Sequence, residues 1–459
     1  MKKMIYREEF DSLGPVKVPA DAYYGAQTQR ALDHFTISGI RFPSFFIANI
    51  ALIKKHAATV NNALGLIDAK KAEAIYNAAC MVMDGCFDDS FVLDVFQSGS
   101  GTNTNMNVNE VIATRANELL TGKRRTRSPV HPNDHVNCCQ SSNDVFPSAT
   151  RMTALTRITR SLLPAILKLH ESLEKKARAF SHIKKVGRTH LQDAVVMSLG
   201  DEFSGYARQA QLAVERLESV RKRLLALPLG GTAVGTGINA HKEFAPRVIA
   251  RIAEESGFDF YEAENHFEAQ SCMDTAVEAM GVLKVIAVGI ARIANDIRWL
   301  ASGPRCGIGE IHLPAIAPGS SIMPGKVNPV ICEAAIQCAA QVMGNDAAVT
   351  HGGTGGFFEI NLMQPMIAHN LFASIELLSG SASLLAEKCV VGIVADEAKC
   401  EENVRKSLAT VTGLVPHIGY DRAAEIAKKA HEQGLSIEEA AIAEKVIPTA
   451  ELKKALYGE

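Results

Sequence analysis

The sequence predicts an all-α protein built around a bundle of long helices. Apolar residues recur every three or four positions over stretches much longer than a usual helix, and strand-like alternation is scarce. Several of these stretches are apolar on more than one face. With 459 residues, the chain is too long for a single compact core and long enough for two or three domains.

Long helical patterns follow one another through the middle of the chain. In the first, which begins at Val145, the later steps are of three or four residues, through Met152, Leu155, Ile158, Leu162, Ile166, Leu169 and Leu173. Similar patterns cover 193–227, 271–300, 329 to about 343 and 361 to about 388. A helix of about 30 residues is about 45 Å long, and helices of this length are typical of a bundle.

Some of these helices are expected to be buried on all sides. The segment VIAVGIARIA (285–294) is an example, because its apolar residues cover the whole helical circumference. One chain offers too few long helices to surround one of its own. The sequence therefore predicts self-association through the long helices.

The regions on either side of the long helices differ from them in character. Residues 1–138 read as a mixed region of shorter helices and loops, 139–395 as the long-helix domain, and 396–459 as a small, more charged helical domain. In the last of these, Ser436 and Glu439 have the spacing of a capping box, which predicts a helix start.

Composition and charge argue against several classes of protein. The net charge is −2 and the densest basic stretch, 123–127, is short, so nucleic acid is not expected as the main partner. No uncharged apolar run reaches the roughly 18 residues of a membrane span, and the first residues lack the apolar core of a secretory signal. A mature mitochondrial form is an alternative, but the initial Met and the absence of a transit segment favour a cytoplasmic protein.

The ten cysteines are expected to be reduced thiols rather than disulfides or metal ligands. None are spaced C-x-x-C, and the adjacent pair Cys138 and Cys139 would chelate one metal poorly. The sequence thus predicts neither a zinc site nor an iron–sulfur site.

Short polar segments, rich in Gly, Ser, Thr and Asn, interrupt the helical pattern. They cover 98–110, 131–144, 187–193, 230–239 and 318–329. Each alone is most simply a turn or a helix cap. Together they supply many small donors, which suit carboxylates and other anions at helix N-termini. Nucleotide binding is not supported, because GTGIN lacks the third glycine of a dinucleotide loop and MPGKVN lacks P-loop spacing.

Two of these polar segments carry the strongest candidates for chemistry. In 318–329, Gly319 and Gly325 bound a loop that could be an ordinary connector or could close over a ligand. Pro329 suits the first turn of the following helix. His190 is expected at the start of a long helix, where a lone histidine is more often structural than functional.

The polar segments as a set resemble the fumarase/aspartase superfamily. Its loop reads GSSIMPxKVNP, and here 319–329 reads GSSIMPGKVNP; the resemblance extends from VPADAYYGAQTQR (18–30) to PHIGYDRAAEIAKKAH (416–431). It implies a three-domain fold with a central bundle of long helices, assembled as a homotetramer whose active sites are shared between chains. Gly325, Ser142, the segment SGPRCGIGEI (302–311) and the segment 357–370 are similar to class II fumarases rather than aspartases.

The resemblance implies a hydro-lyase for the fumarate–malate step of the tricarboxylic acid cycle. Water would add to fumarate in the anti sense to give L-malate, without metal or organic cofactor. The alternatives are an aspartate ammonia-lyase, other lyases of the superfamily, and a catalytically silent structural or binding protein that keeps the lyase fold.

The resemblance also implies roles for individual residues. Ser320 would be the general base and His190, with Glu333, would act on the water from the opposite face. Lys326 would stabilise charge. Substrate contacts would come from Ser100, Gly101, Thr102, Ser141, Ser142, Asn143, Thr189, Ser321, Lys326, Val327 and Asn328. A second dicarboxylate site would comprise His131, Pro132, Asn133 and Asp134. Many members have a basic residue where Ser128 stands, and here Arg127 lies one step earlier.

Overall fold

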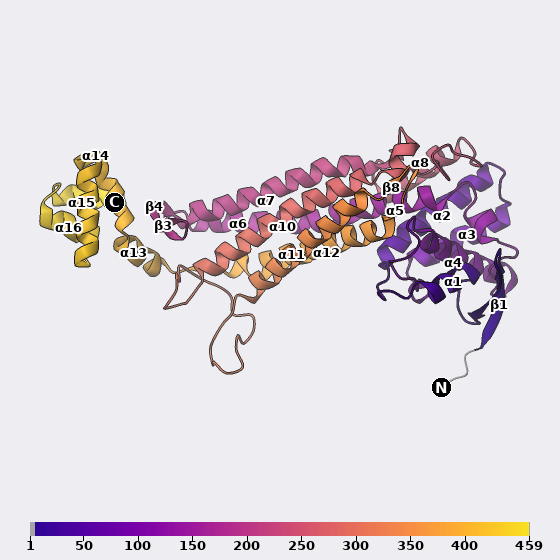
Figure 1. The fold of residues 1–459 in the computed structure, drawn as a ribbon, viewed down its shortest axis with the longest axis horizontal. Helices are drawn as coiled ribbons and strands as arrows, with labels where there is room; N and C mark the ends of the chain where they lie inside the picture. Colours follow the sequence, from indigo (N-terminus) through magenta and orange to yellow (C-terminus); the bar gives the residue numbers. More distant parts are fainter. Residues whose placement is uncertain (1–4, 459) are drawn as a thin grey trace. The chain divides into compact units, whose positions relative to one another are not determined.

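A computed structural model of the chain describes residues 5–458 and shows a mostly helical protein with short strands (Figure 1). The all-α expectation holds in this coarser form, since the strands of the described part form only two-stranded ribbons. The chain divides into two compact units, which are described separately. Unit 1 comprises Met1–Leu163, Arg216–Val285 and Gln341–Leu378, and unit 2 comprises Pro164–Glu215, Ile286–Ala340 and Ser379–Glu459.

Unit 1 combines helices with short strands and turns. Its helices are α1 (Ala26–His34), α2 (Ser44–Ala63), α3 (Ala69–Met83), α4 (Thr102–Thr121), α5 (Ser142–Arg157), α8 (Phe244–Ser256) and α9 (His266–Ser271). Its strands are β1 (Tyr6–Asp11), β2 (Gly14–Pro19), β5 (Ala226–Leu227), β6 (Tyr261–Glu262), β8 (Gly356–Phe357) and β9 (Ile360–Asn361). The 3₁₀ helices η1 (Asp88–Ser90) and η4 (Lys222–Leu225) and the π-helical segments η2 (Pro132–Val136) and η3 (Ile158–Leu162) complete it.

Helix α2 forms the centre of the core of unit 1. Phe46, Ile50 and Ile53 follow helical spacing and are all fully buried. Helix α2 packs against α3, α4, α5 and α8, and the Phe46 ring lies 5.1 Å from that of Phe146 in α5. Burial of each such side chain contributes about 1.5–3 kcal/mol. This packing fixes the N-terminal ends of α4 and α5, where two of the polar segments lie.

Unit 2 contains a β-hairpin, a smaller two-stranded ribbon, and helices that include those at the C-terminal end of the chain. The hairpin is β3 (Lys184–Thr189) with β4 (Gln192–Ser198), and a smaller ribbon pairs β7 (Ile311–His312) with β10 (Val394–Ala395). The helices are α6 (Leu163–Ala179), α13 (Glu397–Lys406), α14 (Val415–Ile418), α15 (Tyr420–Gln433), α16 (Ile437–Glu444) and α17 (Thr449–Tyr457). The unit also contains the 3₁₀ helices η5 (Val390–Gly392) and η6 (Leu408–Leu414), of which η6 connects α13 to α14.

The remaining long helices each contribute residues to both units. They are α7 (Leu199–Arg221), α10 (Asp274–Leu300), α11 (Val330–Gly353) and α12 (Gln364–Lys388). Within unit 2, α6 lies beside α7 and α12, and α7 lies beside α10 (Figure 1). The expected helices in 271–300 and 361–388 are therefore confirmed, with small shifts at their ends. The helix expected over 329–343 continues to Gly353.

The helix expected over 193–227 is wrong at its start. Residues Gln192–Ser198 form β4, which pairs antiparallel with β3, and α7 begins only at Leu199. Val195 and Val196 favour a strand, and a short apolar run before a helix does not reveal by periodicity which element it belongs to. The expected position of His190 at a helix start is wrong for the same reason, since His190 lies in the turn of the hairpin.

The C-terminal helices of unit 2 pack on the β3–β4 hairpin. Val186 in β3 belongs to a buried cluster that also contains Val404, Leu414, Ile426 and Leu452. Ser436 and Glu439 form the capping box expected at the start of α16. One face of the hairpin is thereby held by the C-terminal elements. Among the described residues, no helix is both long and apolar enough to cross a membrane.

Candidate active site

Two helix N-termini meet in unit 1 and bring together hydroxyl groups from two of the polar segments. Helix α4 begins at Thr102 and α5 begins at Ser142. The Thr102 Oγ1 atom lies 2.8 Å from Ser100 Oγ and 2.8 Å from Ser142 Oγ. Helix N-termini carry free N–H groups and a partial positive charge, so this hydroxyl cluster is suited to a carboxylate.

The start of α5 is fixed by a buried carboxylate. Ser141 and Asp144 form a capping box, in which Asp144 Oδ1 accepts from the Ser141 N–H at 2.9 Å. The other oxygen, Oδ2, accepts from the N–H groups of Gly230 and Thr232, each at 3.0 Å. The Asn143 side chain donates to the Ala233 carbonyl at 2.7 Å. The polar segments 131–144 and 230–239 are therefore joined through Asp144.

Gly101 allows the turn between Ser100 and Thr102. Its φ of +71° is left-handed, and a Cβ built on it would lie 2.1 Å from Cδ2 of the buried Phe146 ring. An alanine there would have to displace the ring or the turn.

We expect Gly101→Ala to raise KM for a dicarboxylate by roughly 10-fold or more and to destabilise the protein by about 1–3 kcal/mol. Steady-state kinetics and thermal unfolding check this. Gly122→Ala is the matched control, because Gly122 is also left-handed, at φ +72°, but has open space around its Cβ position. Equal KM values for the two variants would contradict the importance of the Ser100–Thr102 turn.

The residues expected to form a second dicarboxylate site lie at one turn of unit 1. His131 precedes the turn Pro132–Val136, and its Nδ1 atom accepts from the N–H groups of Asn133 and Asp134, both at 3.2 Å. Arg127 Nε lies 2.8 Å from the other ring nitrogen, Nε2. The pKa of His131 is lowered by burial. Ser128 stands at the position where the resemblance leads us to expect a basic residue. Arg127, one position earlier, places its guanidinium beside the His131 ring instead.

The loop 318–329 of unit 2 is closed at its base and exposed at its tip. The Gly319 N–H donates to the Lys326 carbonyl at 2.8 Å, and the Asn328 side chain donates to the Gly319 carbonyl at 2.6 Å. A Cβ on Gly319 would lie 2.4 Å from the Lys326 oxygen, so this base requires glycine. At the tip, Ile322 is 84% exposed. The base of the loop is therefore fixed, whereas its tip is accessible to solvent.

Ser320 occupies a position that suits a negatively charged oxygen. Its Oγ atom accepts from the N–H groups of Ile322 at 3.3 Å and Met323 at 3.1 Å. Backbone N–H groups that already point at an oxygen stabilise charge on it without reorganisation. A serine in this setting is better able to act as a base than an isolated one.

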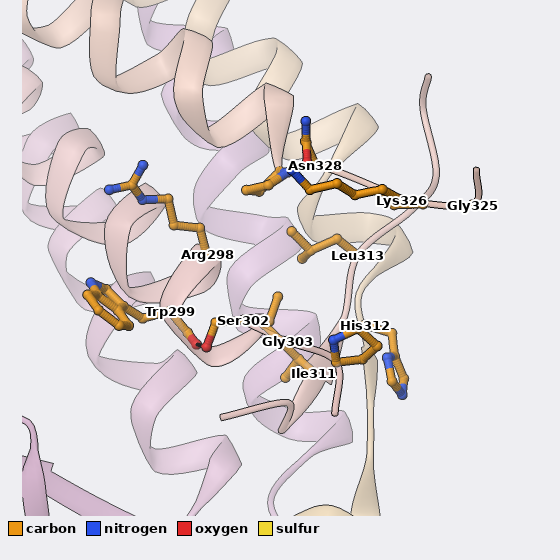
Figure 2. Close-up of a pocket in the computed structure, with 14 residues that line it drawn as sticks. Arg298, Trp299, Ser302, Gly303, Ile311, His312, Leu313, Gly325, Lys326 and Asn328 are labelled. Carbon is orange, nitrogen blue, oxygen red and sulfur yellow. Dashed lines mark hydrogen bonds between the residues drawn. The ribbon is translucent and has the colours of Figure 1, made fainter. Parts of the chain in front are cut away.

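An open cavity of about 660 Å³ lies between the loop and the end of α10 in unit 2. Figure 2 shows Lys326 and Asn328 from the loop together with Arg298 and Trp299 from the helix. Lys326, Val327 and Asn328 were expected from the sequence, whereas Arg298 was not. Arg298 is one of several charged residues in α10, so nothing in the sequence of this helix alone distinguishes it.

The other predicted residues of unit 2 lie on two different elements. Thr189 and His190 are exposed at the β3–β4 turn, and Glu333 lies in the first turn of α11. Neither the His190 nor the Glu333 side chain forms a hydrogen bond to another residue of 5–458. Unit 1 carries Ser100, Gly101, Thr102 and Ser141–Asn143, so each unit holds part of the predicted set. Within 5–458, no group of three or more His, Cys, Asp or Glu side chains is placed to hold a metal ion.

Comparisons with known proteins place the chain in a family. A family model described as lyase matches residues 14–344, and one described as the C-terminus of fumarase C matches residues 410–458. The chain is 54% identical to a class II fumarate hydratase of Nitrosomonas europaea, over 95% of each chain. It is 51% identical to a mitochondrial fumarate hydratase of Rhizopus oryzae, over 95% of this chain and 89% of the other.

Its fold is similar to that of a solved class II fumarase from Schistosoma mansoni. The TM-score is 0.95, the identity is 40%, and 98% of each chain is covered. The similarity thus extends over sequence and fold together. The chain belongs to the class II fumarate hydratase family.

Proposed function

We propose that this chain catalyses the reversible anti addition of water to fumarate, giving L-malate, with Ser320 as the base of the reverse reaction. The observation that carries the proposal is the GSSIMPGKVNP loop, in which two backbone N–H groups point at the Ser320 oxygen. It occurs in a chain 54% identical to a class II fumarate hydratase.

The difficult step in malate dehydration is removal of the C3 proton. Its loss places a second negative charge on the neighbouring carboxylate, which becomes an aci-carboxylate. The barrier falls only if donors already point at that charge. Lys326, Asn328 and the loop N–H groups are the donors that we assign to it, and Ser321 and Val327 belong to the same binding segment. Ser320 takes the proton.

The leaving hydroxide must receive a proton on the other face of the substrate. We assign this general acid role to His190, acting with Glu333 through a bound water. Base and acid on opposite faces produce anti elimination. The other carboxylate of the substrate would contact Ser100–Thr102, Ser141–Asn143 and Thr189. Their hydroxyls and amides can donate hydrogen bonds to a carboxylate. The turn at His131–Asp134, with Arg127 beside it, is our candidate for the second dicarboxylate site.

We further propose a homotetramer in which the 139–395 regions of four chains form the central bundle. Helix α10 supports this, since Val285, Val288 and Trp299 are about half exposed in the single chain, at 46%, 51% and 48%. Apolar side chains of this size on a long helix favour burial by another subunit. The separate placement of the Ser320 loop and the His190 turn on different elements is compatible with sites shared between chains.

The proposed compartment is the cytoplasm. All ten cysteines are free thiols, including Cys332 and Cys389, whose sulfur atoms are 3.8 Å apart. Free thiols are typical of a reducing compartment.

The purified protein should hydrate fumarate and dehydrate L-malate without added metal, and EDTA should leave the rate unchanged. The residues provide no three-ligand group within 5–458, and the proposed chemistry needs only proton transfer and charge stabilisation. The change in ultraviolet absorbance as malate is converted to fumarate measures the rate directly.

The control substrate is L-aspartate, which tests the aspartate ammonia-lyase alternative. Faster release of ammonia from aspartate than of water from malate would overturn the assignment. Loss of activity on chelation would contradict the metal-independent mechanism. No turnover of either substrate by folded protein would favour a catalytically silent protein with the lyase fold.

A further inference from the structure

The turn that carries His190 has a backbone conformation that its residues do not favour. Strands β3 and β4 are joined by two residues, His190 and Leu191, with φ values of +57° and +61°. Two-residue turns with both φ values positive usually contain Asn or Gly, because side chains at these positions are strained. Such strain persists only where the surrounding structure fixes it. The contacts of the hairpin therefore decide whether His190 keeps its position.

The contact nearest to the turn in sequence that involves a buried charge joins Arg188 to Glu310. Arg188 Nη1 and Nη2 donate to Glu310 Oε2 at 2.9 Å and Oε1 at 2.7 Å, so the guanidinium is held in a bidentate pair. Arg188 is only two residues before His190. The Glu310 side chain is 0% exposed, which removes competition from water.

Glu310 is itself held by several other segments of unit 2. Asn403 in α13 donates to Glu310 Oε1 at 3.0 Å, and Lys185 Nζ lies 3.4 Å from Oε2. Its backbone N–H donates to the Leu300 carbonyl at 2.9 Å, and its carbonyl accepts from the Asp396 N–H at 2.9 Å. The Glu310 carboxylate is therefore held in place by other segments, and the hairpin is bound to it through Arg188.

The pairing of β3 with β4 is irregular next to Arg188, and this irregularity affects where the Arg188 side chain points. The register shifts between Val186 and Arg188, and Gly187 lies where a Cβ would be 2.9 Å from the Val195 carbonyl oxygen. Irregularities of this kind redirect side chains near functional sites. Val186 joins the apolar cluster of the C-terminal helices, while Arg188 reaches Glu310.

The charges around Glu310 keep it ionised. Burial alone raises the pKa of Glu310, but the hydrogen bonds from Arg188, the charge of Lys185 and the hydrogen bond from Asn403 together lower that pKa below its ordinary value. Lys185 is shared with Glu202 at 2.6 Å. A neutral side chain at position 310 would leave the charge of Arg188 poorly matched in a buried site.

We propose that Glu310 is a positioning residue for the reaction: through the bidentate pair with Arg188 it holds the strained His190–Leu191 turn in the orientation that proton transfer needs. Glu310 does not touch substrate in this role. The inference rests on the proposed function of His190 as general acid.

The test compares Glu310→Gln with Glu202→Gln in the full-length protein. Both changes remove one carboxylate that pairs with Lys185, but only Glu310 holds Arg188. For Glu310→Gln we expect kcat for malate dehydration to fall by roughly 10- to 100-fold, with KM changing less than about 3-fold. Glu202→Gln leaves both the Arg188–Glu310 pair and the contact of Lys185 with Glu310 in place, so kcat should stay within about 2-fold of the wild type.

A double variant separates positioning from general destabilisation. If Glu310 acts through His190, adding Glu310→Gln to His190→Asn should not lower the residual kcat further. Two losses that multiply, or a wild-type kcat in Glu310→Gln, would overturn the proposal. If Glu310→Gln does not fold, Arg188→Lys retains the charge but not the bidentate pair, and the same kcat loss and the same non-additivity are expected.

Failure of this inference is distinct from failure of the proposed function. An inactive His190→Asn with a fully active Glu310→Gln rejects only the positioning role. A fully active His190→Asn rejects the general acid assignment, and the positioning role with it.

Discussion

Replacing Ser320 by alanine should lower kcat for malate dehydration by roughly 10²- to 10⁴-fold, the usual contribution of a positioned general base. Binding of a dicarboxylate inhibitor should survive, with Kd within about 3-fold of the wild type. The physical reason is that a base acts in the transition state, whereas carboxylate contacts act in both states. The Ser320 oxygen already accepts two backbone N–H groups, which is the arrangement that this role requires.

The neighbouring serine provides a matched control. Ser321→Ala also removes one hydroxyl group from this loop, but Ser321 is assigned to substrate binding. It should therefore raise KM more than it lowers kcat. Rapid kinetics and calorimetry with an unreactive dicarboxylate measure the two effects separately. An Ser320→Ala variant that keeps most of its rate would mean that another residue removes the C3 proton.

The long helices could be predicted from the sequence because one simple pattern determines them. Helix α10 packs side chains such as Met280, Leu283 and Ile290 in the core, and their spacing is visible in the sequence. The ends of the helices were less predictable. The helix begun after Pro329 continues through polar Asn345 and Asp346, which are buried and paired with Ser374 and Lys284. Such pairs join different helices, so they cannot be predicted from the spacing of residues within one helix.

The β3–β4 hairpin was missed for a specific physical reason. Its turn residues are His190 and Leu191 rather than Asn and Gly, so the usual sequence signal of a two-residue turn is absent. The conformation is instead fixed from outside, and Arg188 and Glu310 are separated by 122 positions in the chain. Charge pairs over such distances cannot be assigned from a single sequence.

In the candidate site, too, contacts between neighbouring residues could be predicted from the sequence, whereas contacts between distant segments could not. The start of α5 could be expected from Ser141 and Asp144, because a capping box lies within four residues. The second role of Asp144, which binds the N–H groups of Gly230 and Thr232, could not. The polar composition of each segment favoured anion binding, but only the fold shows that the two segments are joined.

The second large effect expected is recovery of activity by mixing two inactive variants. In the proposed mechanism His190→Asn lacks the acid and Ser320→Ala lacks the base, so each variant alone should be nearly inactive. If the base and the acid at one site come from different chains, mixed tetramers contain some sites that have both wild-type residues. Random assortment of equal amounts gives roughly a quarter of the sites intact, because the two residues are drawn independently in a symmetric oligomer.

The proposed assembly requires that Ser320 of one chain and His190 of another act on the same substrate. Its most direct test is the malate dehydration rate of the two variants after they have been unfolded, mixed and refolded, with native mass measurements to count mixed tetramers. We predict recovery towards a quarter of the wild-type rate for random mixing, and no recovery when each variant is refolded alone. Mixed tetramers that stay as inactive as their parents would contradict the claim, since both residues would then have to come from the same chain.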